Sequence, residues 1–341
     1  MSRSLIVHRA GPGVTVQDLG RAGYLAFGLS RGGAADQLAI YEGAALLGQS
    51  ETLAVLELAG MGGEFEASED MRIALTGGRM RAQIDGEKVA WNASHRLVKG
   101  QRLSIGASEA GCYGYLHIGG GIAAPEVLGA RSGHQAAGIG TPLVSGQRME
   151  IGEDARGETG MTLAPDARFN GGTVRIVKSL QTDFFAPTEI ARFEASEFRR
   201  DTRGNRMGVR VLPDGQGFIS DAGLSVLSEV IVPGDIQITG DGTPFVLLCE
   251  CQTTGGYPRI GSVLPADLPK VAQAQPGTSL RFSFVSLAQA VDIERREKAR
   301  RSALRSKVEP LIRDPRFIPD LLSYQLVGGM TAGDEFEKDK T

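Results

Sequence analysis

The amino-acid sequence predicts a mainly β protein with a few helices. It has 341 residues, enough for two or three domains, and 47 of them are glycine, about twice the usual share of roughly 7%. Glycine-rich turns separate short apolar segments of strand length along most of the chain, a pattern typical of β-barrels and sandwiches. Because hydrophobic residues make up 41% of the chain, it can bury a sizeable core.

The charge balance excludes several functional classes. The 37 Lys and Arg residues and 40 Asp and Glu residues give a net charge of −3, so we expect no nucleic-acid partner. No run approaches 18 apolar residues, and we expect no membrane partner. Three cysteines are too few for a disulfide framework, and Met1 to Arg9 lacks the apolar stretch of a secretory signal. These features predict a cytoplasmic protein.

Residues 1–160 are predicted to form a β-rich N-terminal domain. Residues 4–8 are apolar and of strand length. A helix is expected next, because Asp36 is a good N-cap, apolar residues recur at helical spacing after it, and Gly48 is a typical helix end. Short strands separated by glycine turns then occupy residues 53–120.

A second β-rich domain is predicted over residues 172–290. A polar stretch with several glycines and a proline at 155–172 marks the boundary before it. Its clearest unit is a hairpin over 235–249, with the turn at Asp241-Gly242.

Residues 291–341 are predicted to be a charged helical tail. Ser286 and Gln289 form a capping-box pair in front of a helix rich in Arg, Lys and Glu. Seven basic residues lie between Arg295 and Lys307. We interpret them as a solvated helix face, in preference to a membrane surface or a contact with an acidic partner, because apolar residues are sparse there.

Several short motifs resemble catalytic signatures without the context that these need. Residues 28–32 match G-x-S-x-G, but the helix starts only after Asp36, so we predict a turn with a surface serine. Cys249 and Cys251 alternate along a strand and are predicted to be small buried residues, with no metal site. Among the four histidines, only His134 lies in a polar loop suited to a functional site.

Two segments are better candidates for a ligand site. The first, 16–24 with 33–36, concentrates carboxylate, guanidinium and amide groups among glycines. The second, 252–258, follows an apolar strand directly and offers two hydroxyls and several free N–H groups, which suit an oxyanion or phosphate. Taken alone, the second segment is equally compatible with a plain glycine turn and a packed tyrosine.

These segments resemble a family called allophanate hydrolase subunit 2, KipA-like or biotin-dependent carboxyltransferase, which includes the C subunit of 5-oxoprolinase and the carboxyltransferase part of urea carboxylase. The resemblance covers about residues 5–290 and implies two β-barrel-like halves, the C-terminal one cyclophilin-like. The matching segments, in the family's order, are VQDLGRAGY (16–24), GAAD (33–36), YLHIGGGI (115–122), NRMGVR (205–210), GDIQITGDGTPFVLL (234–248), QTTGGYP (252–258) and ADLPKVAQ (266–273).

The resemblance implies a subunit of an ATP-dependent amide hydrolase of the 5-oxoprolinase type. Such an enzyme opens 5-oxo-L-proline to L-glutamate, using ATP with magnesium, together with a subunit 1 homologue (the type of the 5-oxoprolinase B subunit or allophanate hydrolase subunit 1) and a LamB/YcsF-like subunit. One alternative is the carboxyltransferase component of a biotin-dependent urea or amide carboxylase, with biotin carried by another chain. A second is a KipA-like regulatory binder of a kinase inhibitor.

The implied chemistry requires hydrogen-bond donors and a carboxylate. A lactam is a poor electrophile, and phosphorylating its carbonyl oxygen would create a leaving group that water can displace. Asp18, Asp36 and Asp267 are unranked candidates for the catalytic carboxylate. The candidate substrate- and phosphate-binding residues are Gln17, Arg21, Asn205, Arg206, Gln252, Thr253, Thr254, Gly255, Gly256 and Tyr257.

Two departures from the family pattern bear on the substrate. The family commonly has Asp-Ala before QTTGGYP, where this chain has Glu250-Cys251. It commonly has Leu-Pro-Gly-Pro after the domain junction, where this chain has Val177-Lys178-Ser179-Leu180. Both departures lie where a ligand could contact the C-terminal half.

Overall fold

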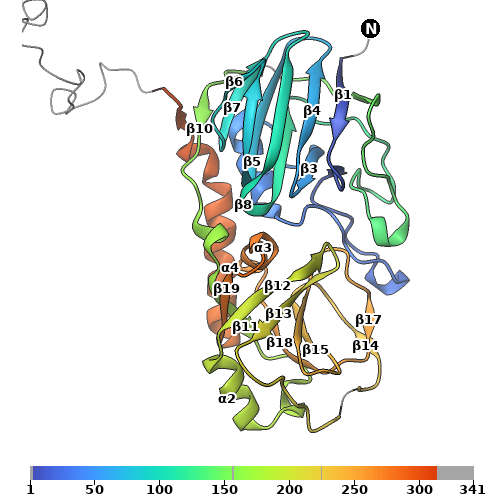
Figure 1. Cartoon of the computed structure of the whole chain (residues 1–341), viewed down its shortest axis with the longest axis vertical. Helices are drawn as coiled ribbons and strands as arrows, with labels where there is room; N and C mark the ends of the chain where they lie inside the picture. Colours follow the sequence, from blue (N-terminus) through green and yellow to red (C-terminus); the bar gives the residue numbers. More distant parts are fainter. Residues whose placement is uncertain (1–2, 156, 224, 313–341) are drawn as a thin grey trace, which may run out of the picture.

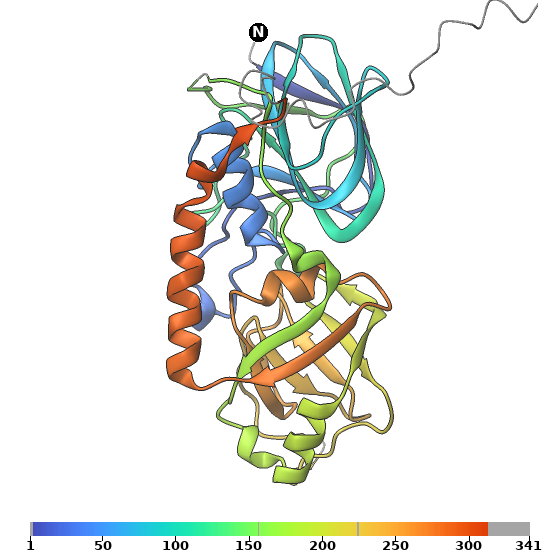
Figure 2. The same cartoon turned by 90° about the vertical axis from the view of Figure 1, so that its left-hand side faces the viewer.

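The protein consists of two β-rich halves stacked along its long axis (Figure 1). The structure is a computed structural model that describes residues 3–155, 157–223 and 225–312. Residues 313–341 of the predicted tail lie outside the described residues. A turn by 90° shows helix α4 (Leu287–Ser302) running along the side of both halves (Figure 2).

In the described residues, the N-terminal half is built on one 11-stranded antiparallel sheet. The two longest strands pair over most of their length, and the sheet curls around a core that includes Leu5, Leu56 and Phe65. Its strands are β1 (Ser4–Ala10), β2 (Thr15–Gln17), β3 (Val55–Ala59), β4 (Gly63–Ala67), β5 (Met71–Ile84), β6 (Glu87–Lys88), β7 (Ala93–Leu97), β8 (Arg102–Ile118), β9 (Arg148–Glu150), β10 (Met161–Thr162) and β20 (Glu309–Pro310).

The predicted first helix is confirmed as α1 (Gln37–Leu47). The Asp36 carboxylate caps it by accepting the Ala39 N–H at 3.3 Å. Gly48 ends it in the left-handed conformation, with φ of 61°. The helix packs on β5, where the Thr76 hydroxyl donates to the Ala39 carbonyl at 3.0 Å.

The C-terminal half is a closed barrel, which confirms the predicted mainly β fold and the barrel in this half. Parallel pairing of its first and last strands closes it, and the predicted hairpin is present as an antiparallel pair. In order around the barrel, its strands are β11 (Gly172–Val177), β18 (Arg259–Val263), β15 (Asp235–Ile238), β16 (Pro244–Leu247), β13 (Gly208–Pro213), β12 (Phe198–Asn205) and β19 (Ser279–Phe284).

Smaller elements surround the barrel. Helix α2 (Pro187–Ala195) places Phe193 in the barrel core, with its ring 4.9 Å from that of Phe198. The other elements are α3 (Leu268–Gln273), the paired strands β14 (Glu229–Val230) and β17 (Thr254–Gly255), and the short 3-10 helices η1 (Leu25–Phe27), η2 (Gln135–Ala137), η3 (Ala167–Asn170), η4 (Thr182–Phe184) and η5 (Leu304–Lys307).

Within residues 3–312, as far as they are described, the chain crosses between the halves twice. It leaves the N-terminal sheet after β10, forms the barrel, and returns through α4 to add β20 beside β10. The predicted capping box of α4 is confirmed: the Ser286 hydroxyl accepts the Gln289 N–H at 3.2 Å, and the Gln289 side chain accepts the Ser286 N–H at 2.9 Å.

Gln273 at the end of α3 joins the halves. Its side-chain oxygen accepts the N–H groups of Cys112 and Tyr113 at 2.8 and 3.0 Å, and its nitrogen donates to the Tyr113 carbonyl and to Asp36 at 2.8 Å each. One apolar cluster also contains residues of both halves, such as Ile40 and Val271. The halves therefore share a buried interface.

Within the described part of the chain, no helix has the length and apolar character needed to cross a membrane.

Candidate functional site

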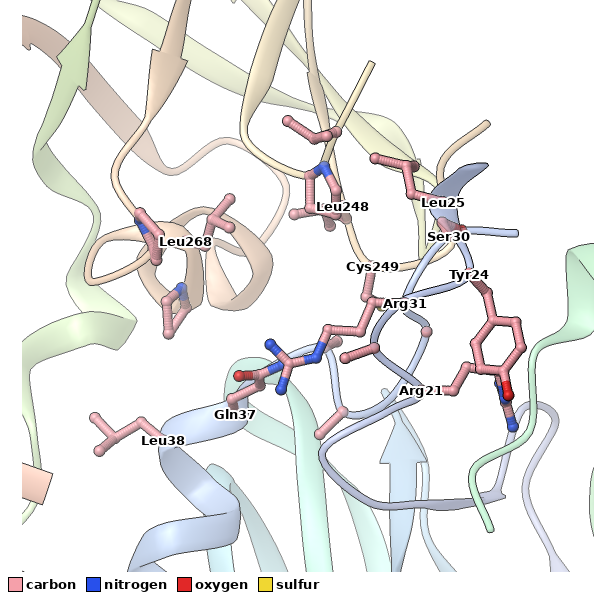
Figure 3. Close-up of a pocket in the computed structure, with 18 of the residues that line it drawn as sticks. Arg21, Tyr24, Leu25, Ser30, Arg31, Gln37, Leu38, Leu248, Cys249 and Leu268 are labelled. Carbon is pink, nitrogen blue, oxygen red and sulfur yellow. The ribbon is translucent and has the colours of Figure 1, made fainter. Parts of the chain in front are cut away.

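A cavity of about 410 Å³ lies between the two halves (Figure 3). The N-terminal half contributes the loop that begins in the VQDLGRAGY segment, and the barrel, α3 and α4 form the other walls. The lining residues are Arg21, Ala22, Gly23, Tyr24, Leu25, Leu29, Ser30, Arg31, Gly32, Ala34, Ala35, Gln37, Leu38, Val232, Pro233, Leu248, Cys249, Pro265, Ala266, Leu268, Pro269, Glu297 and Arg301.

The walls are mainly apolar, with a few polar groups among them. Leu38 of α1, Leu268 of α3 and Leu248, which directly follows β16, are among the lining residues (Figure 3). The Arg31 side chain extends across it between Cys249 and Gln37. An apolar pocket with a few cationic and amide groups suits a small molecule that has an apolar body and an anionic or acceptor group.

Hydrogen bonds within the N-terminal loop fix its shape. The Asp18 carboxylate accepts the N–H groups of Gly20 and Arg131, at 2.8 and 2.6 Å. The Arg31 Nε donates to the Leu19 carbonyl at 2.8 Å. The Gly32 N–H donates to the Cys249 carbonyl at 2.9 Å and so anchors the loop to the barrel.

A buried ionic cluster lies behind this loop and connects the halves. Arg206 of the barrel donates to Glu250 at 2.6 Å, to the Gly33 carbonyl at 2.6 Å and to the Glu57 carboxylate of β3. Burial lowers the pKa of Arg206, but Cys249, Glu57 and Glu250 outweigh it and the net shift is well upward. Arg206 is therefore charged and neutralised by carboxylates from both halves.

The structure does not bring the three candidate catalytic aspartates together. Asp36 is fully buried at the start of α1, and its second oxygen accepts Arg168 Nε at 2.7 Å as well as Gln273. Asp267 precedes α3 and is ion-paired with Arg175 at 2.7 Å. Asp18 supports the loop described above. None of the three is among the described residues that line the cavity.

The candidate binding residues separate into two groups. Arg21 lines the cavity, and both Arg21 and Arg206 act on the pKa of His134. Gln17 is buried under the same loop, where its amide donates to the Thr15 hydroxyl at 3.0 Å. Thr254 and Gly255 instead form β17, outside the lining residues.

The remaining predicted residues lie towards the surface of the barrel. Asn205 is exposed at the end of β12, where its side chain accepts the Met207 N–H at 2.8 Å. Gln252 and Tyr257 are also exposed, whereas Thr253 and Gly256 are half-buried. A Cβ atom placed on Gly28 of the N-terminal loop would lie 4.0 Å from the Thr253 hydroxyl.

Sequence reasoning missed several residues of the site. Arg31, Gln37 and Arg301 gave no local signal, because only the assembled fold brings their three segments together. Glu57 did give a local signal in the sequence, because a carboxylate in the otherwise apolar strand β3 requires a buried partner. The prediction of a surface serine in the G-x-S-x-G turn was wrong, because Ser30 is only 2% exposed and bonds to His134.

Cys249 lines the cavity as a neutral thiol. Burial raises its pKa to about 12, although the Arg206 charge opposes the shift. A thiol with such a pKa is not a nucleophile near neutral pH. Cys251 is buried, as predicted, and its pKa is also raised to about 12 by burial.

The cavity does not fit a magnesium nucleotide. Glu297 is the one carboxylate among the described residues that line it, whereas magnesium in nucleotide sites usually takes carboxylate ligands in addition to the phosphates. In the described residues, no group of three or more His, Cys, Asp and Glu side chains is arranged to hold a metal ion.

Comparison with known proteins identifies the family. The family described as "Carboxyltransferase domain, subdomain A and B" matches residues 27–284. The chain belongs to this carboxyltransferase family. Its relatives include the 5-oxoprolinase C subunit from Haemophilus influenzae, 31% identical over 83% of this chain and 92% of the relative. The corresponding protein from Escherichia coli is 33% identical over 84% and 93%. The resemblance drawn from the motifs is confirmed.

Two solved structures share the fold of this chain. TTHA0988 matches with a TM-score of 0.76 and 28% identity, covering 83% of this chain and 56% of the solved chain. This chain thus spans just over half the length of that one. Kluyveromyces lactis urea carboxylase matches with a TM-score of 0.80 over 92% of this chain and 31% of its own, at 23% identity. That similarity concerns the fold alone.

Proposed function

We propose that this chain is a subunit of an ATP-dependent amide hydrolase that cleaves 5-oxo-L-proline to L-glutamate. The observation that carries the proposal is the cavity between the halves, with apolar walls and the Arg21 and Arg31 cations, in a relative of the 5-oxoprolinase C subunit. 5-Oxo-L-proline matches this lining, because it combines a compact apolar ring with a carboxylate and a lactam carbonyl.

In this proposal, the chain binds and orients the substrate. The leucine-rich walls pack against the ring and exclude water, and the arginines hold the anion through charge-assisted hydrogen bonds. ATP, bound outside this cavity, supplies the activation of the lactam carbonyl.

The proposed partners are a subunit 1 homologue and a LamB/YcsF-like subunit, and the proposed location is the cytoplasm. The relatives are named as one subunit of 5-oxoprolinase, which supports a multi-subunit assembly. Since a single cavity carboxylate and a neutral cysteine among the described lining residues provide little machinery for phosphoryl transfer, we expect the isolated chain to be inactive.

Arg31 provides the direct test. The reconstituted complex should hydrolyse ATP faster when 5-oxo-L-proline is added, and Arg31→Met should raise KM for the lactam about tenfold or more. Arg199→Met is the matched control, because Arg199 is exposed on the barrel, outside the cavity. An absence of lactam-stimulated ATP hydrolysis in the wild-type complex would contradict the proposal.

Asp18, Asp36 and Asp267 remain the proposed catalytic carboxylates, and Asp18 comes first. Asp36 and Asp267 are paired with buried or half-buried arginines, whereas Asp18 accepts two backbone N–H groups beside the cavity loop. The three Asp→Asn variants should be assayed in the complex, with the free energy of unfolding measured in parallel. Three variants of unimpaired kcat would refute this assignment.

The family description supports a second candidate, the carboxyltransferase component of a biotin-dependent urea or amide carboxylase. Under this alternative, a biotinylated carrier and a biotin carboxylase are separate chains. Urea-dependent decarboxylation of carboxybiotin by this chain, without added ATP, would favour the second candidate over the first.

A further inference from the structure

A buried serine–histidine pair lies at the wall of the cavity. The Ser30 Oγ is 2.9 Å from His134 Nε2, and the two residues are 2% and 3% exposed. Ser30 is among the lining residues, next to Arg31. Glu250 lies on the other side of the imidazole, with a carboxylate oxygen 4.0 Å from Nδ1. The three side chains resemble a hydrolytic triad in composition.

The hydrogen bonds of His134 rule out that role. The Ala137 N–H donates to His134 Nδ1 at 3.2 Å, so Nδ1 carries no proton. The Glu250 oxygens instead accept Arg206 Nε at 2.6 Å and the Ala136 N–H at 3.3 Å. The proton of the neutral ring is therefore on Nε2, which donates to the Ser30 Oγ.

The charges around the ring favour this neutral form. Burial lowers the pKa of His134, Glu250 opposes the shift, and the Arg21 and Arg206 cations reinforce it. A ring whose Nε2 already carries a proton cannot accept one from serine. The Ser30 hydroxyl proton consequently remains available to donate to another acceptor.

A second donor without an acceptor lies beside this pair. Arg21 is 2% exposed, and its Nη1 has no hydrogen-bond partner among the described residues. A methyl group at Gly32 would lie 3.1 Å from the His134 ring and 3.3 Å from Arg21 Nη1, so both side chains meet at this glycine. A buried unpaired guanidinium nitrogen is costly unless a ligand satisfies it.

We infer that Ser30 is a substrate-binding residue, positioned by His134, and that its hydroxyl and Arg21 Nη1 together bind the carboxylate of a small acid in the cavity. The identity of that acid as 5-oxo-L-proline rests on the proposed function. A hydroxyl and a guanidinium N–H are both donors, and the two oxygens of a carboxylate can accept from both at once.

Glu250 belongs to the same arrangement. Glu250 bonds both Arg206 and the backbone that leads from His134 into η2. It therefore helps to fix the turn whose Ala137 N–H sets the tautomer of His134.

Steady-state kinetics of the reconstituted complex test the binding role. Ser30→Ala should raise KM for 5-oxo-L-proline about tenfold and leave kcat within about twofold. His134→Ala should show the same KM change, and His134→Gln should restore most of it, because the Gln amide can donate from the Nε2 position. Ser145→Ala, an exposed serine that donates to the His8 carbonyl, should change neither constant.

A loss of kcat by a factor of about 100 or more in Ser30→Ala, with KM unchanged, would overturn the assignment, since that is the result expected of a nucleophile. An unchanged KM and kcat would overturn it as well. Competition by 2-pyrrolidinone, which lacks the carboxylate, should be equal in wild type and Ser30→Ala. If 2-pyrrolidinone competed in the wild type but not in Ser30→Ala, that result would contradict recognition of the carboxylate by Ser30.

Two measurements on the full chain alone do not depend on the proposed function. Nitrogen-15 NMR of histidine-labelled protein should show His134 protonated only at Nε2 near neutral pH, and a proton at Nδ1 would overturn the assignment. A serine-reactive fluorophosphonate should leave Ser30 unmodified by mass spectrometry, and modification there would also overturn it. A wild-type complex without lactam activity, by contrast, would contradict only the proposed function.

Discussion

His117 is a fully buried histidine outside the site. It lies near the end of β8, and its Nε2 is 2.8 Å from the Thr76 hydroxyl. Burial lowers its pKa from 6.5 to about 3, against a smaller opposing contribution from the Ala39 backbone. The ring is therefore neutral in the folded protein, and a proton added to it would leave a buried cation.

Acidification should destabilise the protein through His117. Between pH 6.5 and 3 the unfolded chain binds a proton at His117 that the folded chain excludes. The contribution of the neutral His117 ring to the free energy of unfolding is therefore fully present above pH 6.5 and is lost as the pH decreases. In urea denaturation, the free-energy gap between wild type and His117→Gln should narrow by about 2 kcal/mol from pH 7 to pH 5. An unchanged gap would show that His117 is not responsible.

At the scale of single residues, the partners in the buried ion pairs could not be predicted from the sequence. Arg168 donates to Asp36 at 2.7 Å and to both oxygens of Glu42 at 2.7 and 2.8 Å. Asp36 was predicted both as an N-cap and as a catalytic candidate, and the cap is confirmed. Its partner lies 132 positions away, and such pairing depends on the assembled fold and not on local pattern.

At the scale of single elements, α1 packs against β8 without space for a side chain at Gly43. A methyl group there would lie 2.2 Å from the His117 ring. Glycine inside a helix costs about 1 kcal/mol relative to alanine, so the close contact with the sheet explains its presence.

Gly43→Ala should therefore destabilise the protein, by about 1–3 kcal/mol, although it improves helix propensity. In a His117→Ala background, the same change should stabilise, because the cavity left by the ring accepts the methyl group. Chemical denaturation of the four proteins of this cycle measures both effects. Destabilisation by Gly43→Ala of equal size in both backgrounds would contradict the packing argument.

The helices and strands that were predicted correctly are those indicated by side chains close together in the sequence. The caps of α1 and α4 and the β15–β16 hairpin follow from side chains within a few residues of the turn. The pairing of β10 with β20 joins strands almost 150 positions apart, each only two residues long. Such short segments carry no periodicity from which a strand could be recognised.

At the scale of the whole molecule, the two halves should unfold together. The shared apolar cluster and the four hydrogen bonds of Gln273 cross their interface. We expect one calorimetric transition for the wild type.

Gln273→Met should lower the free energy of unfolding by about 3 kcal/mol or more, because it leaves several buried polar groups without partners. Gln275→Met is the control, since the Gln275 side chain makes a single hydrogen bond within the described residues, to the Gly111 carbonyl. Two separate transitions in the wild type would contradict the shared interface.

The cavity brings together only some of the residues predicted for the site. The VQDLGRAGY segment supplies Arg21 and Tyr24 to its lining, as the motif indicated. The glycine turn after Cys251 was given equal prominence, yet its residues are absent from the described lining. The sequence pattern indicates which segments could contribute to a ligand site. It does not determine which side chains of each segment face the cavity.

The double crossing between the halves has a mechanical consequence. A domain attached by one linker can swing in any direction, whereas two attachments restrict its motion relative to the other half. Here the two attachments are the segment after β10 and the helix α4. Since α4 also contributes Glu297 and Arg301 to the cavity wall, one of the two attachments is itself a wall of the cavity, and the shared buried interface holds that wall in place.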